Sequence, residues 1–118
     1  MGFWMYMLIK KYRLAKRNDF QSIFTTGRKS FNKLFSLRYK LNNLNNSRIA
    51  VVVSNKVSKK ATTRNRIKRQ IRSIISDFLP KFKQNFDIII NILSPASNKE
   101  YGALKEELLK ILKKSNIL

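Results

Sequence analysis

Apolar residues recur along this chain with the periods of helices and strands, and the first such run predicts a short helix. Phe20, Ile23 and Phe24 follow the i, i+3, i+4 spacing of one helical face. A capping-box pattern begins at Asn18, and a glycine at position 27 marks an end. We therefore expect a helix from Asn18 to Gly27.

The next runs predict strands. Residues 31–41 alternate, with Phe35, Leu37, Tyr39 and Leu41 on one face and Ser36, Arg38 and Lys40 on the other. This segment predicts one long strand or two short ones. The asparagine-rich segment 42–46 predicts a turn, and the β-branched run Ile49–Val53 predicts the second arm of a hairpin. A further strand is expected at 87–93.

Two amphipathic helices complete the pattern. Between Ala61 and Leu79 the apolar residues cover roughly 140° of the helical surface; they are Ile67, Ile71, Ile74, Ile75, Phe78 and Leu79. Arg66 and Arg69 point away from this stripe, and Lys68 and Arg72 flank it. Ser97 with Glu100 is expected to open a last helix, whose buried stripe would be Tyr101, Leu104, Leu108, Ile111 and Leu112.

Composition limits the classes of protein. The length of 118 residues predicts one domain, at 10–118. Before it, the apolar residues 1–9 are expected to form a loosely ordered extension. That extension is too short to span a bilayer and lacks the charge order of an export signal, so we expect a cytoplasmic protein without a membrane partner. Met7 is an alternative natural start.

The chemistry that the chain can supply is narrow. It has no cysteine and no histidine, and its six carboxylates are scattered. Thiolate metal sites and histidine bases are therefore excluded, and hydrolysis by protein side chains is disfavoured. We expect no catalytic residue, no protein-bound metal and no small-molecule substrate.

Positive charge is concentrated in the first part of the chain. The net charge is +20, and residues 1–76 hold 19 Lys and Arg against one acid. The segment Lys56–Arg72 has eight positive charges and no acid. Cations at the start of a helix oppose its macrodipole unless an anion binds there. A polyanionic partner is expected, and the alternative is a solvated basic face.

At these residues the sequence resembles a family. Arg64-Asn65-Arg66-Ile67-Lys68-Arg69, followed by Ile71-Arg72, is similar to the signature of the bacterial ribonuclease P protein component. The likeness continues at Tyr12-Arg13-Leu14, Asp19-Phe20, Phe24–Gly27, Arg48–Ser54 with Lys56, Asp87–Ile90 and Pro95-Ala96, covering about residues 10–115. Asn55, Leu93 and Ser94 depart from the basic residues common in the family.

The resemblance implies a fold and a division of labour. The fold would be α/β (α+β), a small two-layer sandwich. Its mostly antiparallel four-stranded sheet would carry three helices and a left-handed β-α-β crossover, an exception to the right-handed rule. The protein would be a subunit of ribonuclease P, whose catalytic RNA holds Mg²⁺ and removes the 5′ leader of precursor tRNA. It would dock on that RNA and hold the leader between the first helix and the sheet.

Site residues follow from the same resemblance. The catalytic-RNA-binding residues would be Arg64, Asn65, Arg66, Lys68, Arg69, Arg72, Lys56, Lys59 and Lys60, and the leader-binding residues Phe20, Phe24, Arg38 and Tyr39. Phe20 and Phe24 could equally be core residues of their helix. Arg38 and Tyr39 lie on opposite strand faces, so only one is expected to meet the leader.

Two other functions stay open from the sequence. A ribosomal or other structural RNA-binding protein would use the same basic helix without any effect on cleavage. An autonomous nuclease would cleave without the catalytic RNA. A reconstitution at low Mg²⁺ separates all three.

Overall fold

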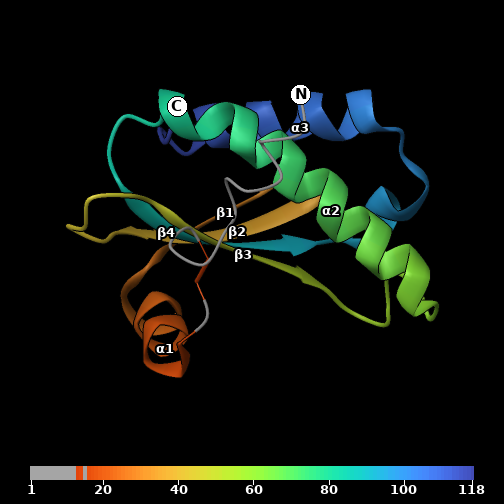
Figure 1. Ribbon diagram of the computed structural model, residues 1–118, viewed down its shortest axis with the longest axis horizontal. Coiled ribbons are helices and arrows are strands. Elements are labelled where there is room, and N and C mark those ends of the chain that lie inside the picture. Colours follow the sequence, from red (N-terminus) through yellow and green to blue (C-terminus); the bar gives the residue numbers. More distant parts are fainter. Residues whose placement is uncertain (1–12, 15) are drawn as a thin grey trace.

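The computed structural model describes residues 13–14 and 16–118, which build one sheet with helices on both of its faces (Figure 1). The extension expected at 1–9 lies outside the described residues. In chain order the elements are α1 (Arg17–Thr26), β1 (Arg28–Phe31), β2 (Phe35–Leu41), β3 (Arg48–Val53), α2 (Ala61–Phe78), β4 (Phe86–Ile92) and α3 (Tyr101–Lys114). Short 3₁₀ turns, Leu79–Lys81 and Ser94–Asn98, follow α2 and β4.

The four strands stand in the order β1-β2-β4-β3. β1 pairs with β2 and β2 with β4 in antiparallel fashion, whereas β3 and β4 are parallel and joined through α2. The expected α+β fold with four strands and three helices is therefore confirmed, and its sheet is mixed. β4 takes an inner position because it is apolar on both faces, and only Asn91 within it is exposed.

The expected hairpin of residues 31–41 with 49–53 is wrong. β4 separates β2 from β3, and the asparagine-rich loop spans that gap. The Asn42 backbone N–H donates to the Asn85 carbonyl at 3.2 Å, and the Asn85 side chain donates to the Leu44 carbonyl at 2.7 Å. The asparagines therefore attach the loop between β2 and β3 to the residue before β4, and they do not form the tight turn of a hairpin.

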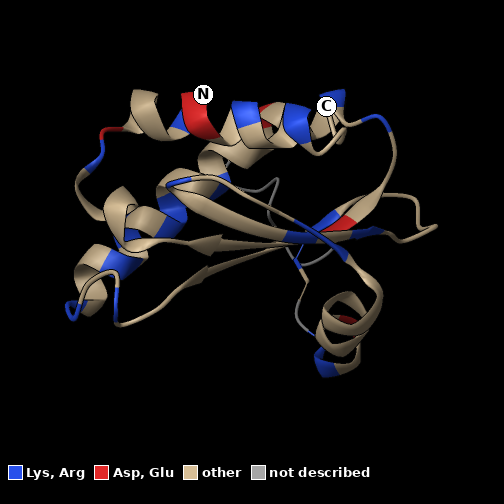
Figure 2. Ribbon diagram, turned by 180° about the vertical axis from the view of Figure 1, so that it is seen from behind, with Lys and Arg blue, Asp and Glu red and all other residues tan. Residues whose placement is uncertain are grey.

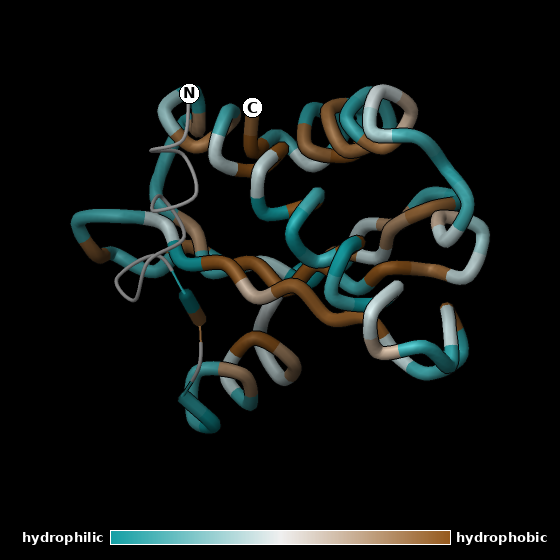
Figure 3. The backbone as a smooth tube through the Cα atoms, turned by 45° about the vertical axis from the view of Figure 1, so that its right-hand side comes forward, coloured by the Kyte–Doolittle hydropathy of each residue, from teal (hydrophilic) through white to brown (hydrophobic). Residues whose placement is uncertain are grey.

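The main core lies between the sheet and the pair α2 and α3, and α1 covers the opposite face (Figure 1). The apolar stripe of α2 is buried as predicted, except that Leu79 is only half-buried. Beneath α1 a smaller cluster joins Leu14, Ile23 and Ile89. The tube in Figure 3 shows the apolar colour running through the strands and the helix faces turned toward them.

Both predicted capping boxes are wrong. α1 begins at Arg17 after Lys16, and α3 begins at Tyr101 after Glu100, neither with a side-chain cap. Position 97 falls instead in the 3₁₀ turn before α3. Tyr101 is exposed rather than buried, and its hydroxyl lies 3.0 Å from Ser73 Oγ on α2. Tertiary contacts, not local caps, therefore set these helix ends.

Gly27 ends α1 as predicted, because the space around its Cα has no room for a side chain. Its φ is −77°, a value that any residue can adopt. A Cβ added there would collide with the Ile23 carbonyl oxygen and press on the Tyr39 carbonyl oxygen at 3.1 Å. The glycine therefore allows α1 to turn directly into β1 against the sheet. No helix in the described part of the chain is long and apolar enough to cross a membrane.

Candidate nucleic-acid interface

A dense group of cations occupies the loop before α2 and the first turns of that helix (Figure 2). Together with Asn65 we call it the helix-end cluster; its cations are Lys56, Lys59, Lys60, Arg64, Arg66, Lys68, Arg69 and Arg72. All the residues that the resemblance assigned to catalytic RNA thus lie on this loop and on α2.

The buried and exposed sides of α2 agree with the predicted helical periodicity. Ile67, Ile71 and Ile74 are buried against the sheet side of α2. Arg66 and Arg69 are exposed, and the two flanking cations Lys68 and Arg72 are half-buried. One face of α2 is therefore committed to the core while the opposite face is free to meet a partner.

The N-terminus of α2 carries no negative charge of its own. Lys60 stands at the N-cap without a side-chain cap, and the first turn has no acid. Arg64 Nη1 donates to the Ser58 carbonyl at 2.9 Å, which ties the guanidinium to the preceding loop. Cations and helix dipole therefore reinforce one another, a combination that favours an anionic ligand.

Arg13 adds a cation that the sequence had not assigned to the site. It bridges to Ile49 at the outer edge of β3, beside α2. Burial, and after it the positive charge of Arg13, lower the pKa of the Arg72 guanidinium below its ordinary value. Only the sheet geometry brings the two together, because 59 positions separate them in the sequence.

Five of the six acids of the molecule pair with cations outside the helix-end cluster. The ion pairs among the described residues join Asp19 and Asp87 to Arg48, Asp77 to Lys105, Glu106 and Glu107 to Lys110, and Glu107 to Lys33. None of these four cations belongs to the helix-end cluster. Its charge is therefore not neutralised by the described part of the chain (Figure 2).

A second, smaller surface lies where α1 meets β2. Phe24 is 52% exposed, and the Arg38 guanidinium carbon lies 4.8 Å from the centre of its ring. Arg38 Nη1 also donates to the Phe24 carbonyl at 3.4 Å. The guanidinium therefore makes a cation–π contact with the ring, and an exposed aromatic ring of this kind is one on which a base can stack.

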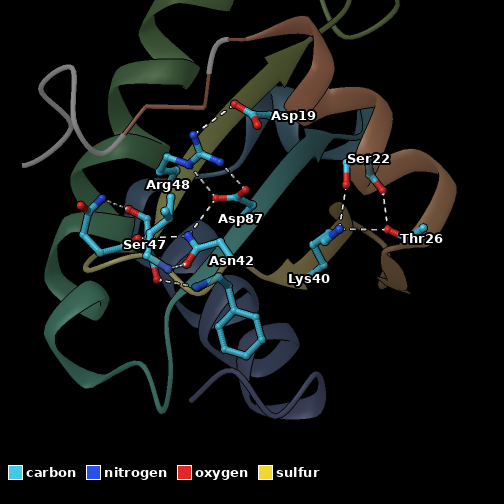
Figure 4. Close-up of polar contacts among 11 residues, drawn as sticks. Asp19, Ser22, Thr26, Lys40, Asn42, Ser47, Arg48 and Asp87 are labelled. Carbon is cyan, nitrogen blue, oxygen red and sulfur yellow. Dashed lines mark hydrogen bonds and ion pairs between the residues drawn. The ribbon is translucent and has the colours of Figure 1, made fainter.

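Lys40 lies on the same face of β2. Its Nζ donates to Ser22 Oγ at 2.7 Å and to Thr26 Oγ1 at 3.1 Å, both on α1 (Figure 4). We call Ser22, Phe24, Thr26, Arg38 and Lys40 the α1 surface. Sequence reasoning missed Lys40, although its alternation with Arg38 places both on one strand face.

The other two predicted leader residues lie apart from this surface. Tyr39 is 8% exposed on the opposite side of the sheet, where its ring meets Phe86 edge-on at 6.2 Å. Phe20 is half-buried against the small cluster of Leu14, Ile23 and Ile89. Of the four predicted residues, only Phe24 and Arg38 come together.

A partly buried ion network holds α1 at this position (Figure 4). Arg48 of β3 donates twice to Asp87 of β4, at 2.9 and 2.6 Å, and once to Asp19 of α1 at 3.1 Å. Asp87 is 5% exposed and also accepts from Asn42 Nδ2 at 2.9 Å. The hydrogen bond to Asp87 raises the pKa of Arg48 above its ordinary value. The network connects α1 to two strands at once.

In residues 13–14 and 16–118 no three His, Cys, Asp or Glu side chains gather in a group that could hold a metal ion.

Comparisons with known proteins agree on one family. The model of the Ribonuclease P family matches residues 8–116. A ribonuclease P protein component of Pseudanabaena sp. is 37% identical over 113 residues, covering 95% of this chain and 97% of that protein. A mutant RNase P protein of Staphylococcus aureus has a TM-score of 0.87 at 26% identity, covering 100% of this chain and 99% of the other. The RNase P protein of Thermotoga maritima has a TM-score of 0.78 at 32% identity, covering 86% and 96%.

Proposed function

Since this chain belongs to the ribonuclease P protein family, we propose that it serves tRNA 5′ processing through two separate RNA-binding surfaces. As a member of that family it is a protein subunit of the ribonuclease P holoenzyme, which processes the 5′ ends of tRNA, and it has an RNA partner. Which RNA each surface meets is our proposal.

The helix-end cluster binds the catalytic RNA. The observation that carries this assignment is the allocation of ion pairs, because five of the six acids pair with other cations and no ion pair among the described residues reaches this cluster. Arg66 and Arg69 project from a helix whose opposite face is buried, so they can contact phosphates without disturbing the core. Binding through phosphates is driven by counterion release and depends steeply on salt.

The α1 surface holds the 5′ leader of precursor tRNA. The exposed Phe24 ring, with Arg38 beside it, offers a stacking platform that tolerates any base. Lys40, held by two hydroxyl groups, supplies a cation for the adjacent phosphate. Arg38 rather than Tyr39 therefore meets the leader, and Phe20 supports α1 from beneath.

The reacting groups belong to the RNA in this proposal. The chain has no histidine or cysteine, and its carboxylates are engaged in ion pairs or scattered, so we expect the RNA subunit to hold the Mg²⁺ ions. We also expect the holoenzyme to act in the cytoplasm, and residues 10–118 to fold as one domain.

A reconstitution tests the proposal. The purified protein, the cognate catalytic RNA and precursor tRNA are mixed at low Mg²⁺, and cleavage is compared with that of each component alone. We expect the mixture to cleave at the mature 5′ end and the protein alone to be inactive. An absence of enhancement would favour a structural RNA-binding protein, and cleavage without catalytic RNA would favour an autonomous nuclease.

A further inference from the structure

A pocket of about 340 Å³ opens at the end of the sheet where β2 finishes and β4 begins. Its cations are Arg28 on β1, Lys40 on β2 and Lys83 in the loop before β4. Its remaining walls are formed by polar and aromatic residues and one leucine: Thr26, Tyr39, Leu41, Gln84, Phe86, Ser115 and Asn116. No acid lines it. Its volume exceeds by about tenfold the ~30 Å³ that a water molecule occupies in the liquid.

Neutral groups position two of the three cations. Lys83 Nζ donates to Asn116 Oδ1 at 2.6 Å, and Lys40 Nζ donates to the hydroxyls of Ser22 and Thr26. Because the partners are an amide and two hydroxyls, they orient the ammonium groups without cancelling their charge. Arg28 is exposed and forms no ion pair with a described residue.

The C-terminal end of the chain fixes the wall that holds Lys83. After α3, Asn116 adopts a left-handed backbone with a φ of 62°, and the Ile117 N–H donates to the Leu112 carbonyl at 3.0 Å. The Lys83 N–H donates in turn to the Ile117 carbonyl at 2.9 Å, and Ile117 is buried. Asn116 and Lys83 are thus held by backbone bonds and by the core.

The pocket and the helix-end cluster lie at opposite ends of the sheet. The register pairs Val53, which leads into the loop before α2, with Ile92 at the end of β4, whereas Leu41 pairs with Phe86 at its start. The six residue steps between Phe86 and Ile92 correspond to about 20 Å of strand. Through Thr26 and Lys40 the pocket adjoins the α1 surface.

We propose that this pocket binds a phosphoryl group. Three cations line one pocket, with the side-chain amides of Gln84 and Asn116 beside them and no acid among the described lining residues, and together they match the charge and the acceptor oxygens of a phosphate. The phosphate could belong to a free phosphate compound or to the end of a single-stranded RNA that has passed the α1 surface. Only the second source rests on the function proposed above.

Titration of the isolated full-length protein with inorganic phosphate tests the proposal. Backbone amide resonances are followed by NMR, and we expect saturable shifts at Gln84, Asn116 and Lys40. Lys83→Ala and Arg28→Ala should each raise the dissociation constant for these shifts about tenfold, because each removes a charge-assisted hydrogen bond.

Lys81→Ala is the matched control. Lys81 is exposed, two residues from Lys83, and outside the pocket, so its loss lowers the net charge equally. The dissociation constant of this variant for inorganic phosphate should stay within about twofold of the value for the unmodified protein. Equal weakening by Lys81→Ala and Lys83→Ala, or an absence of shifts at the pocket amides, would overturn the proposal.

A second arm identifies the source of the phosphate. One short single-stranded RNA is prepared with a 5′ phosphate and with a 5′ hydroxyl. In addition to the shifts with inorganic phosphate, shifts at the pocket amides with the 5′-phosphorylated RNA but not with the 5′-hydroxyl RNA would assign the site to an RNA end. Shifts with inorganic phosphate but with neither RNA would assign it to a free phosphate compound. Both results support a phosphoryl site. The titration contains no catalytic RNA, so its failure leaves the reconstitution result intact.

Discussion

The helix-end cluster and the α1 surface both present cations to RNA, but they hold those cations in different ways. At the helix end, exposed side chains such as Arg66 and Arg69 stand along one helix face and form no ion pair with an acid in the described part of the chain. On the α1 surface, Arg38 lies against the Phe24 ring and Lys40 is held by two hydroxyls. The first surface therefore depends on the amount of charge, and the second on the placement of a few groups.

The largest expected effect comes from removing the ion network that holds α1, and with it the α1 surface, against the sheet. Arg48→Met should lower the free energy of unfolding by about 3 kcal/mol, because it leaves the Asp87 carboxylate buried without its partner. Urea denaturation followed by circular dichroism measures the change. Lys105→Met, which removes the exposed ion pair to Asp77, serves as the control and should cost less than about 1 kcal/mol. If the two variants lost the same free energy of unfolding, the Arg48 network would not contribute to holding α1.

Removal of the stacking ring tests the α1 surface directly. Phe24→Ala should weaken binding of precursor tRNA by about 1–3 kcal/mol, because a base loses its stacking partner. Mature tRNA, which lacks the leader, should bind as before. The holoenzyme is titrated with both RNAs.

Phe31→Ala provides the matched control for that experiment. Phe31 is 69% exposed on the edge strand β1 and lies outside the α1 surface. Its loss should leave the ratio of the two affinities unchanged. A similar loss for mature and precursor tRNA with Phe24→Ala would contradict a leader contact.

Removal of one charge tests the helix-end cluster. Arg66→Ala should weaken binding of the catalytic RNA and reduce the slope of log K against log salt by about one, because one phosphate contact is lost. Lys113→Ala removes an exposed charge from the end of α3 and should leave the slope unchanged. An unaltered slope for Arg66→Ala would exclude Arg66 from the contact.

The finest test compares the same conservative change at the two surfaces. Arg66→Lys should retain most of the affinity for catalytic RNA, because the charge remains. Arg38→Lys should lose about 0.5–1 kcal/mol of leader binding, because a lysine lacks the planar guanidinium that lies against the Phe24 ring. Binding of catalytic RNA to the first variant and of precursor tRNA to the second measures the pair. Equal effects would mean that both surfaces act through charge alone.

The sequence predicts the helix-end cluster almost completely, because one continuous helix carries it. The spacing of Ile67, Ile71 and Ile74 fixes the buried face, and the exposure of Arg66 and Arg69 follows from the same period. Residues that meet only through the tertiary fold could not be predicted in this way. Arg13, whose backbone bridges to Ile49 of β3, lies close enough to Arg72 for its charge to lower the pKa of that guanidinium, and no local pattern encodes this proximity.

The α1 surface was predicted in part. Strand alternation places Arg38 and Tyr39 on opposite faces, but only the packing of α1 decides which face meets it. Helix periodicity likewise treats Phe20 and Phe24 as equivalent, whereas in the structure Phe20 packs against the small cluster beneath α1 and Phe24 stays exposed. The hairpin of β2 and β3 failed because adjacency in the sequence was taken as adjacency in the sheet.

The inner place of β4 also sets the order in which the molecule can fold during synthesis. β2 and β3 have no direct pairing, so the sheet cannot close before residues 86–92 are available. By then the ribosome has already made the segment that carries 19 Lys and Arg against one acid. The growing chain is therefore a polycation before it has its core. Its sheet pairs segments far apart in sequence, which slows folding and lengthens the time during which that charge is displayed without a fixed shape.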